Sequence, residues 1–179
     1  MPKIKHYILT SITLGSIALV SAGAIGLVNM FTNKKIAQNE IDKTNSAITT
    51  IFGEGASIAK ESSLEDFNIE NNYSYLGTIY TVNLNEDLLG YGFKTSGSNA
   101  YGKIVLIVGF TVTANAFKGL YPVVNEQSYA STLVDNYITP LNEGSRNLDD
   151  VSCGATYGAK LVEAMVNEAK DAMEKVNKV

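Results

Sequence analysis

The chain has 179 residues, of which 45 % are hydrophobic, and its formal net charge is −4. This length suits one compact domain together with a membrane anchor. Beyond Lys3 and Lys5, 12 of the 14 basic side chains stand against 18 acidic ones, a balance that argues against a nucleic-acid partner. Because Cys153 is the one cysteine and His6 the one histidine, we expect no metal site and no histidine-dependent hydrolytic triad.

Residues 1–33 are predicted to form a short cytoplasmic tail and a transmembrane anchor. No Asp, Glu, Lys or Arg occurs between Tyr7 and Asn33. A helix over 8–31 would be about 36 Å long, enough to cross a hydrocarbon core of about 30 Å. The alternative is a signal peptide cleaved near Ala22-Gly23-Ala24, but the apolar run continues past that point to Met30. An uncleaved single span would leave a domain of residues 34–179 on the extracytoplasmic side of the cell membrane.

The segment that follows the anchor is predicted to be helical as far as Phe52. Isoleucines recur there at roughly helical spacing, at Ile36, Ile41, Ile48 and Ile51. Gly53-Glu54-Gly55 is expected to end this helix. The polar stretch 56–71 is predicted to be irregular, with at most one short helical turn.

Strands are predicted in the middle of the chain, where β-branched and aromatic residues gather. The expected strands are 73–82, 88–94, 103–113 and 119–124. Segment 103–113 is nearly continuous in apolar residues, so we expect it to be central in the sheet. Thr95 to Asn99 has the composition of a turn.

Two helices are predicted after the strands. The first covers 129–138 and is expected to stop at Pro140. The second covers about 157–177 and carries one apolar stripe, formed by Val162, Met165, Ala169, Met173 and Val176. The predicted fold class is therefore α+β, with a small mixed or antiparallel sheet, packed helices and one preceding N-terminal transmembrane helix.

The segment directly before the last helix carries the candidate chemistry. It reads Asp150-Val151-Ser152-Cys153-Gly154-Ala155-Thr156. Thr156 would stand at a helix N-terminus, where unpaired N–H groups and the positive end of the helix dipole favour a phosphate group. Gly154 and Ala155 are too small to obstruct a bulky group. A structural alternative is that Thr156 is only a helix N-cap.

This segment resembles the flavinylation motif of FMN-binding domains, which has an Asp, two variable positions, a Ser or Thr, and then Gly-Ala-Thr. Such domains occur in the G subunit of Rnf-type electron transport complexes and in the C subunit of the sodium-translocating NADH:quinone oxidoreductase. The resemblance implies FMN joined by a phosphoester to Thr156 through an FMN transferase that uses FAD. Asp150, Cys153, Gly154, Ala155 and Tyr157 would then be cofactor-binding residues.

The sequence departs from that pattern at three places. Cys153 replaces the Ser or Thr before Gly-Ala, and Gly158 stands where the family often has Ser or Thr. The family's Glu-Thr-Pro-Gly-like loop, which lines the flavin ring, corresponds to 124–128, where Glu126 matches the acid and the Pro-Gly part is missing. We expect Cys153 to behave as a small buried hydrophobe.

Strand tyrosines such as Tyr101 are expected to pack rather than to stack on a flavin, with Tyr157 as the exception.

The resemblance implies an electron carrier within an Rnf-like ion-translocating complex, rather than a self-contained enzyme with catalytic residues of its own. Its partners would be other membrane subunits and, during maturation, the FMN transferase. Two alternatives stay open. One is a stand-alone extracellular electron-transfer flavoprotein. The other is a membrane-tethered binding module without flavin, which the three departures from the motif motivate.

Overall fold

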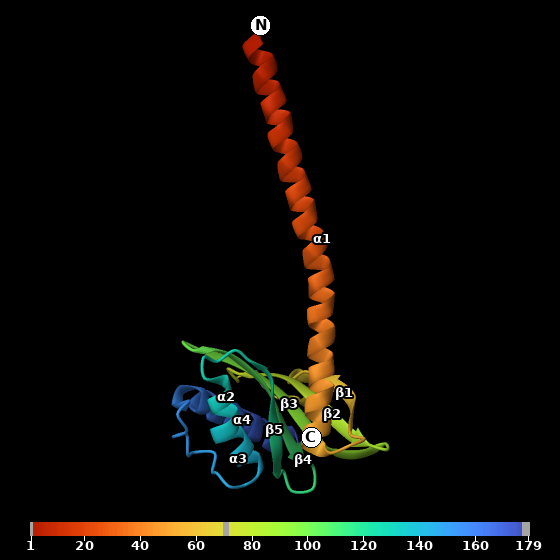
Figure 1. The fold of residues 1–179 in the computed structure, drawn as a ribbon. Coiled ribbons are helices and arrows are strands. Elements are labelled where there is room, and N and C mark those ends of the chain that lie inside the picture. Colours follow the sequence, from red (N-terminus) through yellow and green to blue (C-terminus); the bar gives the residue numbers. More distant parts are fainter. Residues whose placement is uncertain (1, 70–71, 177–179) are drawn as a thin grey trace. The chain divides into compact units, whose positions relative to one another are not determined.

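The computed structural model describes residues 2–69 and 72–176. It divides into two compact units, residues 1–42 and 43–179, and the division falls within the long helix α1 (Pro2–Phe52). Figure 1 shows the order of the elements along the chain. The remaining elements are β1 (Ser57–Ser62), η1 (Glu65–Phe67), β2 (Leu76–Leu84), β3 (Asp87–Asn99), β4 (Gly102–Thr111), β5 (Phe117–Asn125), α2 (Ala130–Leu133), η2 (Val134–Ile138), α3 (Thr139–Asn142) and α4 (Thr156–Val176).

In the first unit, α1 contains a stretch that is long and apolar enough to cross a membrane. This stretch covers Ser11–Met30, and its side chains are exposed. Apolar side chains that no protein group covers are what a lipid-facing helix presents. Length and composition fit a membrane protein, and a signal sequence near the N-terminus would meet the same two criteria.

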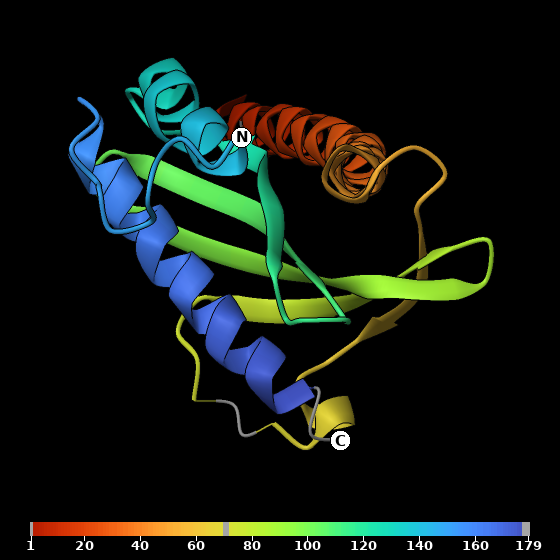
Figure 2. The same ribbon diagram turned by 90° about the horizontal axis from the view of Figure 1, so that it is seen from below.

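The second unit is built on one antiparallel sheet of five strands. The strands follow one another in the order β1-β2-β3-β4-β5, so each pairs with its neighbour in sequence. Helix α4 runs diagonally across one face of this sheet, and α2, η2 and α3 lie beside it (Figure 2). The last turns of α1, residues 43–52, cover the other face. The predicted α+β class and antiparallel sheet are confirmed.

Each face of the sheet has its own apolar core. Under α4, strand residues such as Leu106 and Val108 pack with Met165 of the helix, and all three are fully buried. Every residue of the apolar stripe expected on the last helix is buried, which confirms the amphipathic pattern. On the opposite face Ile48 and Ile51 of α1 pack on the sheet.

Glycines let α1 approach that second face closely. A Cβ at Gly92 would lie 2.9 Å from Ile48 Cδ1, and one at Gly109 would lie 2.4 Å from Ile51 Cγ2. Strand β4 lies between β3 and β5 and is buried on both sides, as its continuous apolar run predicts.

Three boundary predictions are wrong. The polar segment expected to be irregular contains β1, an exposed edge strand that pairs with β2 and has a bulge between Ile58 and Lys60. The expected turn at 95–99 is instead the end of β3, which stays paired as far as Asn99. Small residues are needed there because α4 lies over them: a Cβ at Gly97 would be 2.8 Å from Leu161 Cδ1.

The third wrong boundary is at Pro140, which does not end the helical segment. Helical structure continues from α2 through the π-helical turn η2 into α3, and Pro140 occupies the first turn of α3. A proline is tolerated there because its missing N–H is not needed in a first helical turn.

Candidate functional site

Thr156 is the first residue of α4. The carbonyl of Ala155 accepts the hydrogen bond from Ala159 N–H at 3.0 Å, so Ala155 occupies the N-cap position. Thr156 therefore follows the cap, and its side chain is half-buried. Within the described residues its hydroxyl makes no hydrogen bond, which leaves the oxygen available for chemistry rather than for capping.

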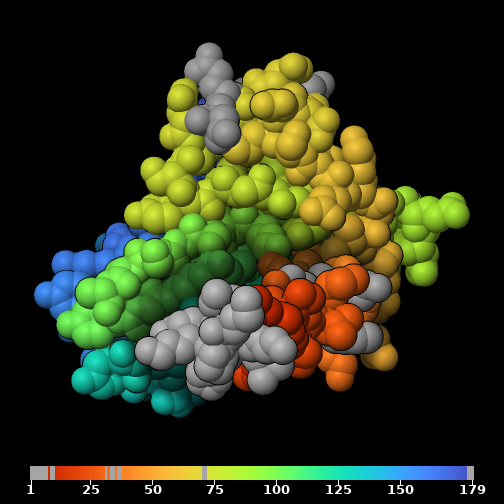
Figure 3. Space-filling view, turned by 90° about the horizontal axis from the view of Figure 1, so that it is seen from above, coloured from red at the N-terminus to blue at the C-terminus, as the bar shows by residue number. Residues whose placement is uncertain are grey.

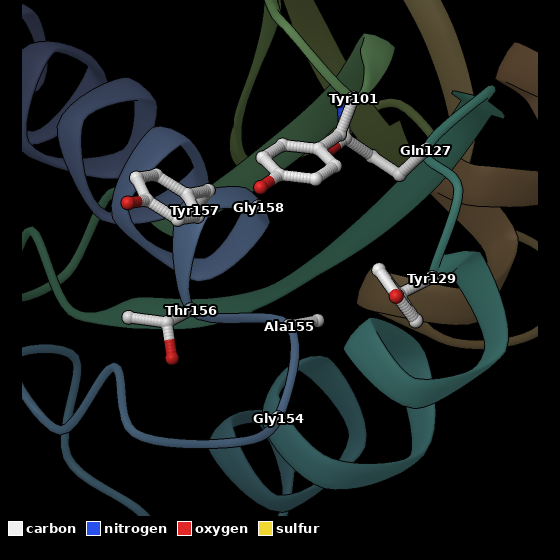
Figure 4. Close-up of a pocket in the computed structure, with 8 residues that line it drawn as sticks. All are labelled: Tyr101, Gln127, Tyr129, Gly154, Ala155, Thr156, Tyr157 and Gly158. Atoms are coloured by element: carbon white, nitrogen blue, oxygen red, sulfur yellow. The ribbon is translucent and has the colours of Figure 1, made fainter.

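A cavity of about 320 Å³ opens beside this threonine. It is of the size that small-molecule sites commonly have. Figure 4 shows its walls, which come from three separate parts of the second unit. The lining residues are Tyr101, Gln127, Tyr129, Gly154, Ala155, Thr156, Tyr157 and Gly158.

These parts adjoin at one end of the surface. Figure 3 shows the green of the β3–β4 hairpin, the cyan that follows β5 and the blue of α4 next to one another there. No residue that lines the cavity carries a formal charge. The lining side chains therefore suit the uncharged part of a ligand, and any charge on that ligand would have to be met by backbone groups.

Exposed tyrosines form one wall. The rings of Tyr101 and Tyr157 stack with their centroids 5.3 Å apart and their planes 25° from parallel. Tyr129 is tilted against Tyr101, with a centroid distance of 6.4 Å. Their exposed fractions are 39 % for Tyr101, 56 % for Tyr129 and 65 % for Tyr157, so large aromatic faces remain open to a ligand.

The side chain of Asn99 holds the stacked pair in place through the main chain. Its Oδ1 accepts a hydrogen bond from Tyr101 N–H at 2.8 Å, and its Nδ2 donates to the carbonyl of Tyr157 at 3.1 Å. Gln127 Nε2 also donates to Asn99 Oδ1, at 3.1 Å. One amide thus joins the β3–β4 hairpin, the end of β5 and the start of α4.

The hairpin reaches this position because of Gly102. Its φ is +133°, and a Cβ there would lie 2.1 Å from the carbonyl oxygen of Glu126. Only glycine permits so close an approach of two backbones in this conformation. Ser128 N–H then donates to the carbonyl of Tyr101 at 2.9 Å, which fixes the segment after β5 against the hairpin.

The loop that leads into Thr156 is held by the helical segment α2–α3. Tyr137, which is fully buried, donates a short hydrogen bond to the carbonyl of Leu148, and burial raises the pKa of its hydroxyl. Asn136 Nδ2 donates to the carbonyl of Cys153 at 3.2 Å. Gly154 then turns the chain into α4 with a φ of +84°, a conformation that glycine adopts without strain.

The residues singled out by sequence fall into two groups. Gly154, Ala155, Thr156 and Tyr157 line the cavity. Cys153, Asp150 and Glu126 do not: the cysteine is 7 % exposed and packs in the core under α4, while the two acids are exposed. The carboxylate of Asp150 lies 3.6 Å from Arg146 Nη2, whose Nη1 also bonds the Asp150 carbonyl at 2.9 Å, so this pair braces the loop.

The sequence analysis gave Gln127 no role of its own within the loop 124–128, missed Tyr129 and Asn99, and assigned Tyr101 to packing. Gln127 directly follows the acid at 126, but a single Gln after a strand has no distinctive pattern. The usable signal was Gly158, because a glycine inside a helix can mark a close approach of a neighbouring group. A Cβ on Gly158 would lie 3.0 Å from Leu133 Cδ2 and 3.3 Å from Gln127 Oε1. Two of the departures from the motif, Gly158 and the loop at Gln127, therefore contact each other.

Comparison with known families gives a match at the other end of the chain. Residues 1–51 match a family described as the RnfG N-terminal region. The match supports an RnfG-like family. It covers nearly all of α1 and none of the residues that line the cavity. No curated protein matches the chain.

Proposed function

We propose that this chain is a membrane-anchored electron carrier with FMN joined by a phosphoester to Thr156, and that it serves as the G-type subunit of an Rnf-like complex. The observation that carries the proposal is the unbonded Thr156 hydroxyl on the wall of a neutral cavity beside stacked tyrosines. The match of residues 1–51 to the RnfG N-terminal region supports the setting in the membrane. Its partners are other membrane subunits, and the domain lies on the extracytoplasmic side.

The described residues fit the group that the proposal requires. The first turn of α4 offers backbone N–H groups to a phosphate, and the flanking Gly154 and Ala155 leave room around it. Tyr101 and Tyr157 offer flat faces on which an isoalloxazine ring can stack. When bound, FMN supplies one- and two-electron redox chemistry.

Flavin attachment needs a separate enzyme, because none of the residues that line the cavity is a general base that could activate the Thr156 hydroxyl. In the proposed reaction the Thr156 oxygen displaces AMP from the FMN phosphorus of FAD, and the hydroxyl proton is lost to solvent or to the transferase. The loop held by Tyr137, Asn136 and Arg146 presents the hydroxyl at the surface for that enzyme.

The decisive experiment is intact mass spectrometry and in-gel flavin fluorescence after co-expression with an FMN transferase. The wild type should gain about 438 Da, the mass of FMN less one water. Thr156→Ala should gain nothing, and Thr156→Ser, which keeps a hydroxyl, should be modified. A wild type of unchanged mass would overturn the carrier proposal and favour a tethered binding module without flavin.

The role of the stacked tyrosines is tested on the modified protein. Stacking on tyrosine quenches flavin fluorescence, so Tyr101→Ala and Tyr157→Ala should raise the fluorescence per attached flavin, with the mass increase intact. Tyr121→Ala is a matched control, because this half-buried tyrosine packs with the core on the α1 face and does not line the cavity. Equal fluorescence in all of these variants would show that the ring does not rest on the pair.

A further inference from the structure

The amide of Gln127 has a fixed orientation. Its Nε2 donates to the carbonyl of Gly102 and to Asn99 Oδ1. The Asn99 oxygen is itself identified, because it accepts the backbone N–H of Tyr101. Since both neighbours of Gln127 Nε2 are acceptors, the amide nitrogen must face them and the carbonyl oxygen must face the other way.

The carbonyl oxygen that results has no hydrogen bond within the described part of the chain. Gln127 is only 7 % exposed, and its Oε1 faces Gly158, which also lines the cavity. Figure 4 shows Gln127 beside Tyr101, across the cavity from Thr156. Because this oxygen opens on the cavity and no group of the described chain occupies it, it is free to accept a hydrogen bond from a bound ligand.

The surroundings specify the donor. The lining residues are uncharged, and aromatic faces line the same cavity, so the donor belongs to a flat, neutral group. We propose, resting on the function proposed above, that Gln127 Oε1 accepts a hydrogen bond from the imide N–H (N3–H) of the flavin ring tethered at Thr156. Gln127 is then a positioning residue: it sets where the ring docks and takes no part in electron transfer.

Gly158 completes this arrangement. With no side chain at that position, the acceptor stays open to a ligand. A serine there would bring a hydroxyl next to Gln127 Oε1, which would take up the acceptor while both bonds of Nε2 stay in place. Gly158→Ser therefore removes only the free acceptor, Gln127 Oε1. Gln127→Met removes the acceptor and also the two structural hydrogen bonds of Nε2.

The test is proton NMR of the modified, membrane-anchored protein carrying ¹⁵N-labelled FMN. In the wild type, the N3–H proton should exchange with solvent roughly tenfold more slowly than in free FMN, as one net hydrogen bond allows. Gln127→Met and Gly158→Ser should both lose this protection while keeping the mass increase. Ser128→Ala, a neighbouring change that leaves the amide in place, should keep the protection.

Each outcome bears on a different proposal. A wild type without added mass overturns the carrier function and this inference with it. Added mass with N3–H exchange as fast as in free FMN overturns the role of Gln127 alone. Protection that persists in both variants has the same meaning, because the N3–H would then bond to water or to another residue. A variant that fails to fold leaves the wild-type exchange rate to decide.

Discussion

At its C-terminal end α4 is held by charged side chains, whereas at its N-terminal end it is held by amide and backbone groups. Near the C-terminal end, Lys175 Nζ lies 2.9 Å from Asp171 and donates to Tyr73 at 2.8 Å. One turn earlier, both oxygens of Glu168 accept backbone N–H bonds from Ser74 and Tyr75. The polar groups that join this part of α4 to residues 73–75 are therefore paired with one another, and they fasten the helix to the domain.

The N-terminal end differs because two of its polar groups stay unpaired. The Thr156 hydroxyl and Gln127 Oε1 make no hydrogen bond among the described residues, and the tyrosines beside them are exposed. One helix thus carries a closed end that fastens it to the domain and an open end that can receive a ligand. Changes at the closed end should affect stability alone, and changes at the open end should also affect flavin attachment.

The largest expected effect is from Gly102→Ala at the open end. The new Cβ would meet the Glu126 carbonyl in a backbone conformation that alanine rarely adopts. We expect the free energy of unfolding to fall by about 2–4 kcal/mol. The extent of flavin attachment should also fall, because Tyr101 moves. Urea denaturation and intact mass measure the two effects.

The matched control for that change is Gly144→Ala. Gly144 also has a positive φ, +72°, but a Cβ there meets nothing within 4 Å. Gly144→Ala should lower the free energy of unfolding by about 1–2 kcal/mol, from backbone strain alone. Equal losses from the two substitutions would mean that the contact between Gly102 and Glu126 is not tight.

Tyr137→Phe should have the next largest effect. It leaves the carbonyl of Leu148 without its buried donor, and we expect a loss of about 1–2 kcal/mol. Because the same loop presents Thr156, the rate of flavin attachment should fall as well. Time-resolved intact mass during transferase treatment measures that rate. Normal attachment in a destabilised Tyr137→Phe protein would show that the loop does not need this bond to present the threonine.

Glu168→Gln tests the closed end. The amide keeps one acceptor for the backbone of residues 74 and 75 and loses the other, so we expect about 1 kcal/mol of destabilisation at this half-exposed position. Flavin attachment should be unchanged. Glu174→Gln, on the exposed face of the same helix, is the control and should be neutral. Lost attachment in Glu168→Gln would contradict the separation of the two ends.

The smallest effect concerns alkaline pH. Burial, followed by the bond to Asp171, raises the pKa of the Tyr73 hydroxyl, and hydrogen bonds to Tyr73 and Asp171 raise the pKa of Lys175. Both groups hold their protons more tightly when folded. Their contribution to the stability of the fold is therefore complete below the ordinary pKa values of 10.0 for Tyr73 and 10.5 for Lys175. It is lost as the pH rises through the pKa values of the folded protein.

Thermal unfolding followed by circular dichroism checks this direction. The wild-type Tm should fall from about pH 9 to about pH 11, and Tyr73→Phe should fall less because its titrating hydroxyl is gone. Tyr129→Phe at the open end should behave as the wild type does. An equal fall in Tyr73→Phe would place the alkaline sensitivity elsewhere.

Periodic patterns predicted most of the fold, because burial on one or both faces imposes them. The apolar run of β4 and the stripe of α4 are examples. The edge strand β1 was missed because exposed strands lack an apolar pattern, and the end of β3 because its small polar residues looked like a turn. Pro140 misled because the helical segment continues through a π-helical turn into α3, where the proline occupies the first turn.

The candidate site divides in the same way. The local motif located Gly154, Ala155 and Thr156 at the start of the last helix, and the structure places all three on the cavity wall. Asn99 and Gln127 could not be found from local sequence, because their importance arises only when the hairpin, the end of β5 and α4 come together. Residues that act through tertiary contacts form no motif of regular spacing in the sequence.

Asn99 positions the two stacked tyrosines by bonding their backbones and makes no hydrogen bond to their rings. The identity of either ring can therefore change without moving the chain that carries it. Phenylalanine or tryptophan at 101 or 157 would alter the polarity and electron richness of the stacking surface while its location stays the same. At this end of α4, single substitutions at 101 and 157 could therefore be used to tune the surroundings of a bound ring while the backbone stays in place.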